Sequence, residues 1–326
     1  MRYYVTGAAG FIGSHLCEEL ALLGHQITAF IHYNSRGDIG NLRYLSTKAL
    51  RNVAIVKGDI QDPFSVEYTM RGHERVFHLA ALIGIPYSYV SPASYVSTNI
   101  QGTLNVLEAA KKNRVKGLVH TSTSEVYGSA IYTPIDEKHP LQGQSPYSAS
   151  KIGADQLAES YYRSFDLPVA IIRPFNTYGP RQSLRAVIPT IISQLLLGKK
   201  KIRLGSITPI RDFNYVKDTV AGFIRVSSGP EAIGKVINVG SGRGVSVKQV
   251  FKMIDQMLNT KAMIETDETR VRPQKSEVVE LLCDHALAGK TVNYKPKWPL
   301  EKGLEATIAF IKENLEQYQH ASEYMV

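Results

Sequence analysis

The chain has 326 residues, of which 44% are hydrophobic and 21% are charged, and its formal net charge at pH 7 is +9. This composition is typical of a soluble globular protein with one large or two modest domains. The basic residues are scattered, and the densest run, Lys199 to Lys201, follows an apolar helix-like stretch. Such a run is typical of a solvated helix end, so we expect no nucleic-acid partner.

Other classes of protein are also disfavoured. The longest apolar stretch, Val187 to Leu197, is too short to cross a bilayer, so we expect no membrane partner. Cys17 and Cys283 match no metal or redox spacing and are expected to be packing residues, with no metal site. The sequence begins with a strand-like segment rather than a secretory signal, so we expect a cytoplasmic location.

Up to Arg173, short β-rich runs alternate with helical patterns. The predicted strands are Tyr3–Val5, Gln26–Ile31, Val53–Lys57, Arg75–Leu79, Gly117–Ser122 and Val169–Arg173. The clearest predicted helices are Ser14–Leu23, Thr98–Lys112 and Tyr147–Phe165. Apolar strands that alternate with helices predict a parallel sheet buried on both faces. Right-handed crossovers then give a Rossmann-type, doubly wound α/β fold.

After Arg173 the pattern becomes irregular, because prolines and glycines interrupt it. The expected elements are helices at Val187–Leu197, Asp218–Val226, Ser246–Leu258 and Leu300–Tyr318, and a strand-turn at Ile202–Gly205. This pattern predicts a smaller mixed α/β lobe. We assign residues 1–177 to the Rossmann domain, with returning segments near 211–240 such as the strand-like Lys235–Asn238. Residues 178–210 and 241–326 form the second lobe.

Three glycines follow the first predicted strand and precede an amphipathic helix. Gly7, Gly10 and Gly13 have the spacing G-x-x-G-x-x-G, and Phe11 and Ile12 open the helix. Glycine lets the backbone turn tightly and approach a pyrophosphate, whose negative charge the helix dipole and N–H groups favour. In this strand–turn–helix context, the spacing predicts a dinucleotide-binding loop.

The end of the second predicted strand lacks the acidic residue that binds the ribose hydroxyls of NAD. Asn34, Ser35 and Arg36 stand there instead. They leave room for a 2′-phosphate and favour NADP, although Arg36 is equally well explained as an exposed loop residue. After the third strand, Asp59 and Ile60 are placed to contact the adenine end of the cofactor; the alternative for Asp59 is a loop cap.

Tyr147 and Lys151 lie four residues apart on a predicted helix, so they share one face. Ser145 and Pro146 before them form a helix-start signal. A free tyrosine has a pKa of about 10 and is a poor base at neutral pH, but a nearby ammonium lowers that pKa. The pair therefore predicts a phenolate that takes a proton from a hydroxyl as hydride leaves the same carbon.

These motifs together resemble the extended short-chain dehydrogenase/reductase family, in its branch of sugar-nucleotide epimerases and dehydratases. The resemblance covers nearly the whole chain. It rests on Thr6–His15, His78–Ala81, Ser122–Gly128, Tyr147 with Lys151, Arg173–Arg181 and Arg211–Phe213. It implies a tightly held NAD or NADP and a nucleoside-diphosphate sugar bound across the interface of the two lobes. It also implies a homodimer built from the helices near 99–112 and 147–165.

The resemblance assigns further residues to the two ligands. Leu79, Ala80, Ala81 and Asn99 join Tyr147 and Lys151 around the cofactor. Thr123 holds the sugar oxygen beside Tyr147. Asn176, Arg211 and Arg272 contact the diphosphate, because a guanidinium donates two parallel hydrogen bonds to phosphate; Arg272 is alternatively part of a surface salt bridge. The remaining expected substrate residues are Ile83, Arg181 and Val187.

A carboxylate beside Tyr147 decides the reaction. Oxidation at C4 of the sugar acidifies the C5 proton, and its removal lets the C6 hydroxyl leave as water before hydride returns to C6. Glu125 is the candidate base for this 4,6-dehydration, whereas a 4-epimerase needs no such carboxylate. Many dehydratases carry Asp-Glu where this chain has Ser124 and Glu125. Either Glu125 also protonates the leaving hydroxyl, or the enzyme processes a 5,6-ene sugar or decarboxylates UDP-glucuronate.

Two segments resemble a narrower group, the UDP-N-acetylglucosamine dehydratase-like enzymes of legionaminic and pseudaminic acid pathways. They are Ala80–Tyr89 and His32–Gly37. Within the first, the apolar stretch Leu82–Ile85 suits an N-acetyl methyl group better than a uronate, and the segment contains no cation for a carboxylate. We therefore expect a UDP-N-acetylhexosamine 4,6-dehydratase that forms a 4-keto-6-deoxy sugar. The alternative of a non-catalytic NAD(P)-binding redox sensor usually lacks the tyrosine or the lysine, and both are present.

Overall fold

Seven parallel strands form the central sheet of the computed structural model, which describes residues 1–319. The strands are β1 (Arg2–Thr6), β2 (Gln26–His32), β3 (Val53–Gly58), β4 (Arg75–His78), β5 (Gly117–Thr121), β6 (Val169–Pro174) and β11 (Val236–Val239). Their order is β11-β6-β5-β4-β1-β2-β3, and every neighbouring pair is parallel. The predicted doubly wound sheet is confirmed, and its strand order reverses beside β1, where ligands of such sheets bind.

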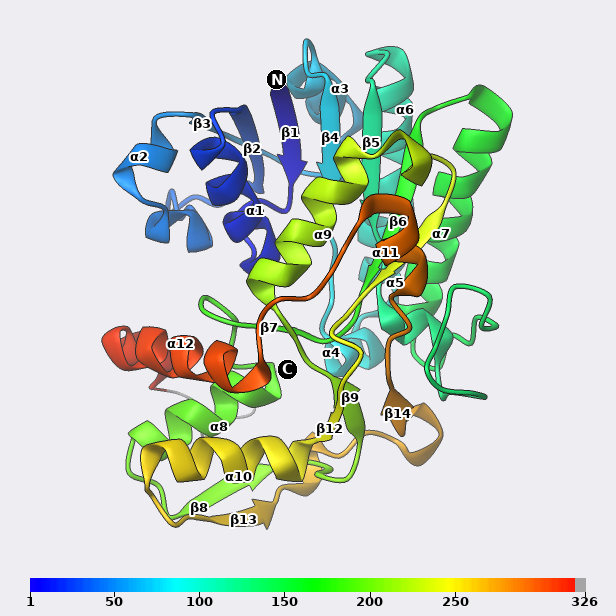
Figure 1. Cartoon of the computed structure of the whole chain (residues 1–326). Coiled ribbons are helices and arrows are strands. Elements are labelled where there is room, and N and C mark those ends of the chain that lie inside the picture. The colour runs from blue at the N-terminus through cyan, green and yellow to red at the C-terminus, as the bar shows by residue number, and fades with distance from the viewer. Residues whose placement is uncertain (320–326) are drawn as a thin grey trace.

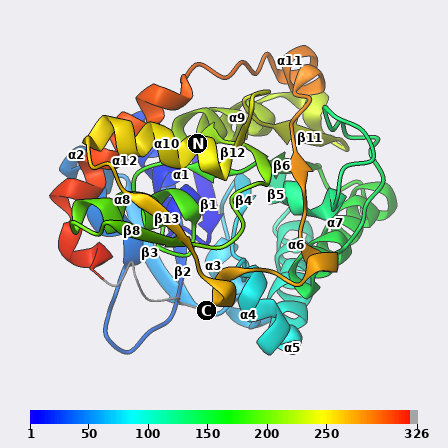
Figure 2. The same ribbon diagram turned by 90° about the horizontal axis from the view of Figure 1, so that it is seen from below.

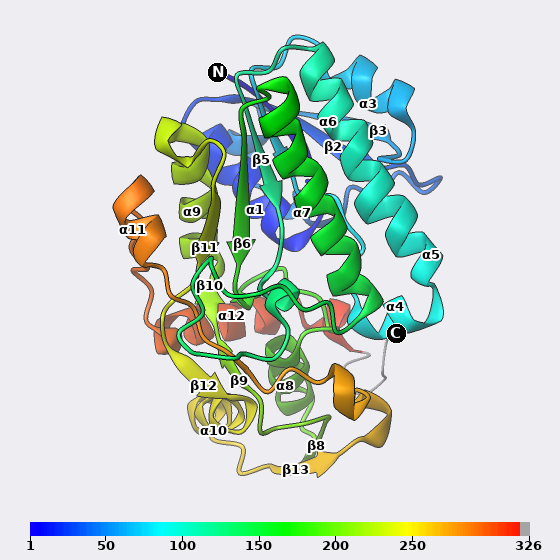
Figure 3. The ribbon, with the colours of Figure 1, turned by 90° about the vertical axis from the view of Figure 1, so that its right-hand side faces the viewer.

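Helices cover both faces of this sheet (Figure 1). One face carries α1 (Phe11–Leu22), α2 (Thr47–Leu50) and α9 (Val216–Ser228), and the other carries α3 (Pro63–Met70), α6 (Gly102–Lys112) and α7 (Pro146–Phe165). In Figure 3, α6 and α7 run side by side along their face of the sheet. Each face buries its own apolar cluster, with Leu16 and Phe223 on one side and Val106 and Ala158 on the other. Full burial of one such large apolar side chain contributes about 1.5–3 kcal/mol.

The helix predicted over Thr98–Lys112 is present as the last part of a longer, irregular helical run. It begins as α4 (Ile85–Val90) and α5 (Pro92–Tyr95), continues as a π-helix over Val96–Gln101, and becomes α6 only at Gly102. By contrast, α7 starts where Ser145 and Pro146 predicted. The Ser145 hydroxyl accepts from the Ser148 N–H at 3.1 Å, and the Ser148 hydroxyl accepts from the Ser145 N–H at 3.0 Å, which makes a capping box.

The second lobe lies beyond the carboxyl ends of the sheet strands (Figure 1). It contains α8 (Val187–Leu196), α10 (Val247–Leu258), α12 (Leu300–Glu313) and the parallel pair β8 (Lys201–Leu204) with β13 (Met263–Thr266). Seen from below in Figure 2, α8 and α10 lie in front of the sheet. Within the described residues, no helix is both long and apolar enough to cross a membrane.

Short strands connect the lobe to the sheet. They are β7 (Thr177–Tyr178) with β10 (Asn214–Tyr215), and β9 (Ile210–Asp212) with β12 (Gly244–Ser246) and β14 (Glu280–Leu281). Between β10 and β12 the chain returns to the sheet with α9 and β11. Farther along the chain, α11 (Ala286–Val292) packs beside β11. The segment between β13 and β14, residues 267–279, is called the strap below.

Candidate active site

The glycine loop joins β1 to α1 at the centre of the sheet. Gly7 has a φ of +68°, and a Cβ there would lie 2.7 Å from the Ala80 nitrogen. A Cβ at Gly13 would lie 2.3 Å from the Gly7 carbonyl oxygen, so neither position accepts a side chain without movement. Gly10 is the N-cap of α1 and offers no side-chain cap, so the first N–H groups of the helix are left for a ligand. These features fit the pyrophosphate of NAD or NADP.

Thr6 fixes the loop after β4 against the glycine loop. Its hydroxyl oxygen accepts from the N–H groups of Leu79 and Ala80, both at 3.1 Å, and lies 2.8 Å from His78 Nδ1. Burial holds the pKa of His78 well below its ordinary value, so the imidazole is neutral. Leu79, Ala80 and the following Ala81 therefore line the edge of the sheet next to the glycines, as expected for cofactor residues.

The loop after β2 is closed by its own polar groups. The Asn34 side chain bonds to both the N–H and the carbonyl of Asp38 at 2.8 Å, while Ser35 and Arg36 are exposed. Asp38 is an acid just past the segment considered in the sequence, and its carboxylate accepts from Gly40 N at 2.9 Å and pairs with Arg43. The loop contains both an acid, Asp38, and an arginine, Arg36, that forms no ion pair within residues 1–319. It therefore indicates neither NAD nor NADP over the other.

Asp59 and Ile60 lie at the end of β3, the outermost strand on this side. The Asp59 carboxylate accepts from Gln61 N at 2.9 Å, which is the loop-cap alternative, although the residue remains half-buried beside the site. Ile60 is buried, and its carbonyl accepts from Asn105 at 3.0 Å. Both residues lie at the carboxyl edge, but the side chain of Asp59 is partly committed to its turn.

Asn99, an expected cofactor residue, is instead fully engaged by the protein. Its amide accepts from Leu82 N at 2.8 Å and donates to Leu82 O at 3.0 Å and to Ser150 Oγ at 2.9 Å. The π-helix turn places this buried side chain between the loop after β4 and α7. Asn99 therefore positions the loop next to Tyr147, which the spacing of the sequence did not reveal.

Tyr147 and Lys151 lie on the buried face of α7, at 7% and 4% exposure. Burial raises the pKa of the Tyr147 phenol, the Thr123 hydrogen bond opposes that rise, and the Glu125 charge adds to it. Burial also lowers the pKa of Lys151 to about 8. We expected Lys151 to lower the phenol pKa, but its ammonium donates to the Thr121 carbonyl at 2.6 Å. Burial is thus the main influence on the pKa of the Tyr147 phenol, and it raises that pKa.

The Ser-Thr-Ser-Glu run turns from the end of β5 toward Tyr147. Thr123 is the N-cap of a 3-10 helix over Ser124–Tyr127, and its hydroxyl accepts from Glu125 N at 3.2 Å. The same hydroxyl bonds the Tyr147 phenol, and the Glu125 charge acts on that phenol. Ser124 is buried at 2% exposure. The structure thus brings Thr123, Glu125 and Tyr147 together.

A cavity of about 280 Å³ lies between the lobe and the sheet. Four of the expected substrate residues line it, namely Asn176, Val187, Arg211 and Arg272. The Asn176 Oδ1 atom is buried and has no hydrogen-bond partner in the described part of the chain, so it is available to a ligand. Arg185 and Arg270 add two further cations to the lining, with Glu277 as an acid. This basic lining fits a diphosphate.

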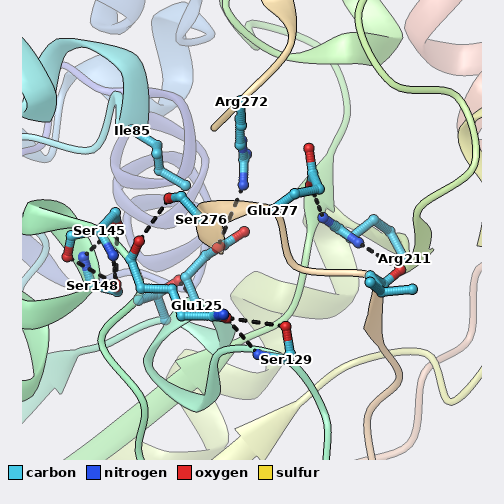
Figure 4. Close-up of polar contacts among 12 residues, drawn as sticks. Ile85, Glu125, Ser129, Ser145, Ser148, Arg211, Arg272, Ser276 and Glu277 are labelled. Atoms are coloured by element: carbon cyan, nitrogen blue, oxygen red, sulfur yellow. Dashed lines mark hydrogen bonds and ion pairs between the residues drawn. The ribbon is translucent and has the colours of Figure 1, made fainter. Parts of the chain in front are cut away.

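The strap brings Arg272 to the catalytic end of the cavity, as Figure 4 shows. Arg272 Nη1 lies 3.7 Å from Glu125 Oε2, and Arg211 Nη2 donates to Glu277 Oε1 at 3.3 Å. Burial lowers the pKa of Arg211, while Glu125 and Glu277 raise it. Ser276 holds the strap in place by donating to Gln144 O at 2.6 Å. Arg272 is therefore part of an ion pair inside the site rather than on the surface.

Two expected substrate residues lie outside the cavity lining. Arg181 is buried and pairs with Glu18 of α1, and it also donates to Tyr44 O at 3.2 Å. This ion pair joins the segment after β7 to α1, and the contact of Arg181 with the substrate stays a prediction. The Ile83 side chain is 58% exposed, and Pro86 is the residue of its loop that lines the cavity.

Arg185 supplies a cation that the sequence of the loop after β4 lacks. A Cβ at Gly84 would lie 3.5 Å from both Arg185 Nη1 and Tyr95 Oη, so the guanidinium reaches this loop. Tyr95 in turn packs edge-on against Tyr147, with ring centroids 6.2 Å apart. The absence of a cation from residues 80–89 therefore does not argue against an acidic sugar. Only the fold brings Arg185 here, so no local signal predicted it.

This site and fold define an NAD(P)-dependent enzyme of the doubly wound class. A family model described as GDP-mannose 4,6 dehydratase matches residues 4–307. A dTDP-glucose 4,6-dehydratase from an Actinoplanes species is 31% identical over 319 residues, covering 96% of this chain and 98% of that protein. The chain belongs to this family of sugar-nucleotide dehydratases and epimerases.

Solved structures give the same result. A dTDP-glucose 4,6-dehydratase from Streptomyces venezuelae with NAD bound has a TM-score of 0.87 at 29% identity, covering 98% of this chain and 100% of that one. UDP-glucuronic acid 4-epimerase from Bacillus cereus, in complex with UDP-glucuronic acid and NAD, has a TM-score of 0.87 at 29% identity, covering 96% and 100%. The predicted family is confirmed, while the narrower resemblance to legionaminic and pseudaminic acid enzymes stays a prediction.

Proposed function

We propose that the chain is a sugar-nucleotide 4,6-dehydratase that acts on a UDP-N-acetylhexosamine. The observation that carries this proposal is the position of Glu125, whose carboxylate lies beside the Tyr147 phenol and 3.7 Å from Arg272 at the cavity. A 4-epimerase has no use for a second base at this place. When bound in the glycine loop, NAD or NADP would supply the hydride acceptor for C4 and the hydride for C6.

The protein's own groups carry the remaining chemistry. Thr123 holds the C4 oxygen, and Tyr147 removes its proton with Lys151 as the neighbouring cation. Glu125 then removes the C5 proton, which the C4 ketone has made acidic. Because Ser124 supplies no carboxyl group, Glu125 also returns that proton to the departing C6 hydroxyl, so that water leaves. When hydride returns to C6, C5 gains a proton, which in the net balance is the one that Tyr147 removed. Arg211 and Arg272 hold the diphosphate, and Arg272 does so from beside Glu125.

The N-acetyl group is proposed from the apolar surface beside Tyr147. Leu82 from the loop after β4 and Ile85 from the start of α4 pack with Tyr95 and Tyr147 in one cluster. This surface suits a methyl group, because apolar contact is favourable there and no hydrogen bond is left unmade. Asn99 holds the loop that carries it, so the surface is fixed relative to α7.

A second candidate is a reaction on a UDP-uronate, and Arg185 favours it. The guanidinium reaches Gly84 from another segment, and within residues 1–319 it has no ion-pair partner. A cation at this place suits a sugar carboxylate. The two candidates differ in the sugar substituent rather than in the chemistry at C4.

Mass spectrometry of the products separates the candidates. The enzyme is incubated in parallel with UDP-N-acetylglucosamine, its 5,6-ene derivative and UDP-glucuronate. Loss of one water from the first supports the dehydratase. Conversion of the 5,6-ene alone contradicts dehydration and assigns a downstream step. Loss of carbon dioxide from UDP-glucuronate, or its epimerisation without change in mass, assigns the uronate reaction instead.

Two further proposals concern the assembly and the cofactor. We propose a cytoplasmic homodimer that pairs the exposed faces of α6 and α7, where Phe165 is 51% exposed and Tyr162 is 37% exposed. Light scattering of the purified protein tests this, and a monomer at micromolar concentration contradicts it.

The choice between NAD and NADP is tested by releasing the bound cofactor and identifying it. Arg36 supports NADP, whereas relatives with bound NAD support NAD.

A further inference from the structure

Asp155 lies on the same face of α7 as the proton-transfer pair. Tyr147, Lys151 and Asp155 are spaced four residues apart, so they are stacked one turn after another. Asp155 is 1% exposed, and the mechanism above gives it no part. A carboxylate buried this deeply is costly unless cations or hydrogen bonds compensate it.

Two neighbouring strands hold this carboxylate. From β6, Arg173 donates to Asp155 Oδ2 through Nη2 at 2.9 Å and through Nε at 3.3 Å. From the end of β5, the Ser122 hydroxyl donates to the same oxygen at 2.7 Å, and His120 Nε2 lies 3.3 Å from Oδ1. Asp155 therefore ties α7 to β5 and β6 at the depth of Lys151.

Ser122 connects Asp155 to the segments that carry the reacting groups. It directly precedes Thr123, whose hydroxyl caps the 3-10 helix that carries Glu125. On the other side of Ser122, the Thr121 carbonyl accepts from the Lys151 ammonium at 2.6 Å. The bond from Ser122 to Asp155 thus fixes the end of β5 relative to Tyr147.

The same carboxylate balances the charge of Lys151. The titratable and charged groups around Lys151 are Tyr147 and Asp155 on α7, His78 on β4, His120 on β5 and Arg173 on β6. Burial lowers the pKa of both histidines, so they are neutral at pH 7, while Arg173 keeps its charge. Burial lowers the pKa of Lys151 to about 8, and Asp155 opposes that shift.

We propose that Asp155 is a positioning residue for the proton transfer: its buried carboxylate keeps the Lys151 ammonium charged and anchors Ser122, so that Thr123 and Glu125 face Tyr147. The inference rests on the proposed cooperation of Tyr147 and Lys151, but on neither the identity of the sugar nor the loss of water. It applies to any reaction that begins with oxidation at C4.

The first test compares Asp155→Asn with Glu159→Gln. Glu159 lies one turn farther along α7, where its Oε1 atom is 2.5 Å from Arg163 Nη2 near the surface. Glu159→Gln therefore removes one negative charge, as Asp155→Asn does. The readout is the pH profile of cofactor reduction in the first turnover. A nearby carboxylate shifts a pKa by about one unit or more. In Asp155→Asn, we expect the loss of activity on the alkaline side of the profile to occur about one pH unit or more lower than in the wild type. Glu159→Gln should keep the wild-type limb, and an unshifted limb in Asp155→Asn overturns the proposal.

Ser122→Ala tests the anchorage if Asp155→Asn does not fold. This small change removes one hydrogen bond and no charge. Misplacement of catalytic groups is costly, so turnover should fall at least about tenfold while the alkaline limb stays in place. Unchanged turnover contradicts the anchoring role.

A measurement without substrate separates this proposal from the proposed function. Asp155→Asn and the double variant Asp155→Asn, Lys151→Met are unfolded with urea between about pH 6 and about pH 8. If Lys151 loses its proton early in the folded single variant, the unfolded chain binds more protons, so stability rises with pH. The double variant should lack that rise. Equal pH slopes overturn the proposal even if no sugar nucleotide is turned over.

Discussion

Arg272 Nη1 lies 3.7 Å from Glu125 Oε2, across the boundary between the strap and the end of β5. Both side chains are mostly buried, at 26% and 13% exposure, so solvent screens their attraction only in part. The guanidinium expected to bind the diphosphate is thus also the one that faces the proposed base. Substrate binding and the placement of Glu125 are therefore coupled.

Glu125→Gln should stop elimination but leave oxidation at C4. The amide keeps the shape of the side chain and cannot accept the C5 proton, so loss of water should fall at least about 100-fold. Reduced cofactor should then accumulate, which its absorbance reports. Wild-type turnover in this variant removes Glu125 from the mechanism.

Arg272→Met should weaken substrate binding. It removes a charged partner of the diphosphate, so KM for the sugar nucleotide should rise at least about tenfold, which corresponds to about 1.4 kcal/mol. The control is Arg243→Met, because Arg243 pairs with Glu301 at the surface, 57% exposed, and should leave KM unchanged. Equal KM values in the two variants would place the diphosphate elsewhere.

The pH dependence of activity and of stability should have opposite signs. Burial lowers the pKa of Lys151 to about 8 in the folded chain, so its ammonium is present below that pH and lost above it. Turnover should therefore fall as pH rises through about 8. The unfolded chain keeps the proton of Lys151 to higher pH. The contribution of Lys151 to the free energy of unfolding therefore increases from about pH 8 to about pH 10. Urea unfolding of wild type against Lys151→Met measures this, and parallel curves contradict it.

Gly7→Ala and Gly24→Ala form a matched pair at positive φ. Gly24 has a φ of +83° and open space around its Cβ position, so alanine should cost only the backbone strain of about 1–2 kcal/mol. At Gly7 the same strain is added to a Cβ placed 2.7 Å from the Ala80 backbone. We expect loss of bound cofactor from Gly7→Ala and its retention in Gly24→Ala, measured on the purified proteins.

Local patterns in the sequence predicted the fold well. Ser145 and Pro146 gave the start of α7, and Lys235–Asn238 gave the returning strand β11, because capping and apolar alternation act over a few residues. The broken course of the helix before α6 was not predicted. Its π-helix turn follows from tertiary bonds of Asn99, which reach Leu82 and Ser150.

The sequence indicated neighbours in the candidate site where one motif carries several residues, as with Thr123 and Glu125 in one run and Tyr147 and Lys151 in another. Neighbours were missed where distant segments meet. Arg185 reaches Gly84, and Arg173 reaches Asp155, only because the sheet and the lobe bring them together. The ion pair between Arg181 and Glu18 was also not predicted, since the motif that contains Arg181 gives no sign of it.

The Thr6 hydroxyl accepts hydrogen bonds from two backbone N–H groups of the loop after β4, both at 3.1 Å. The rim of the dinucleotide site is thereby built into the folded chain, and little ordering remains to be done when the cofactor arrives. A preformed rim of this kind favours slow release. In a reaction that gives the hydride back within one cycle, a long residence time lets one dinucleotide serve many substrates.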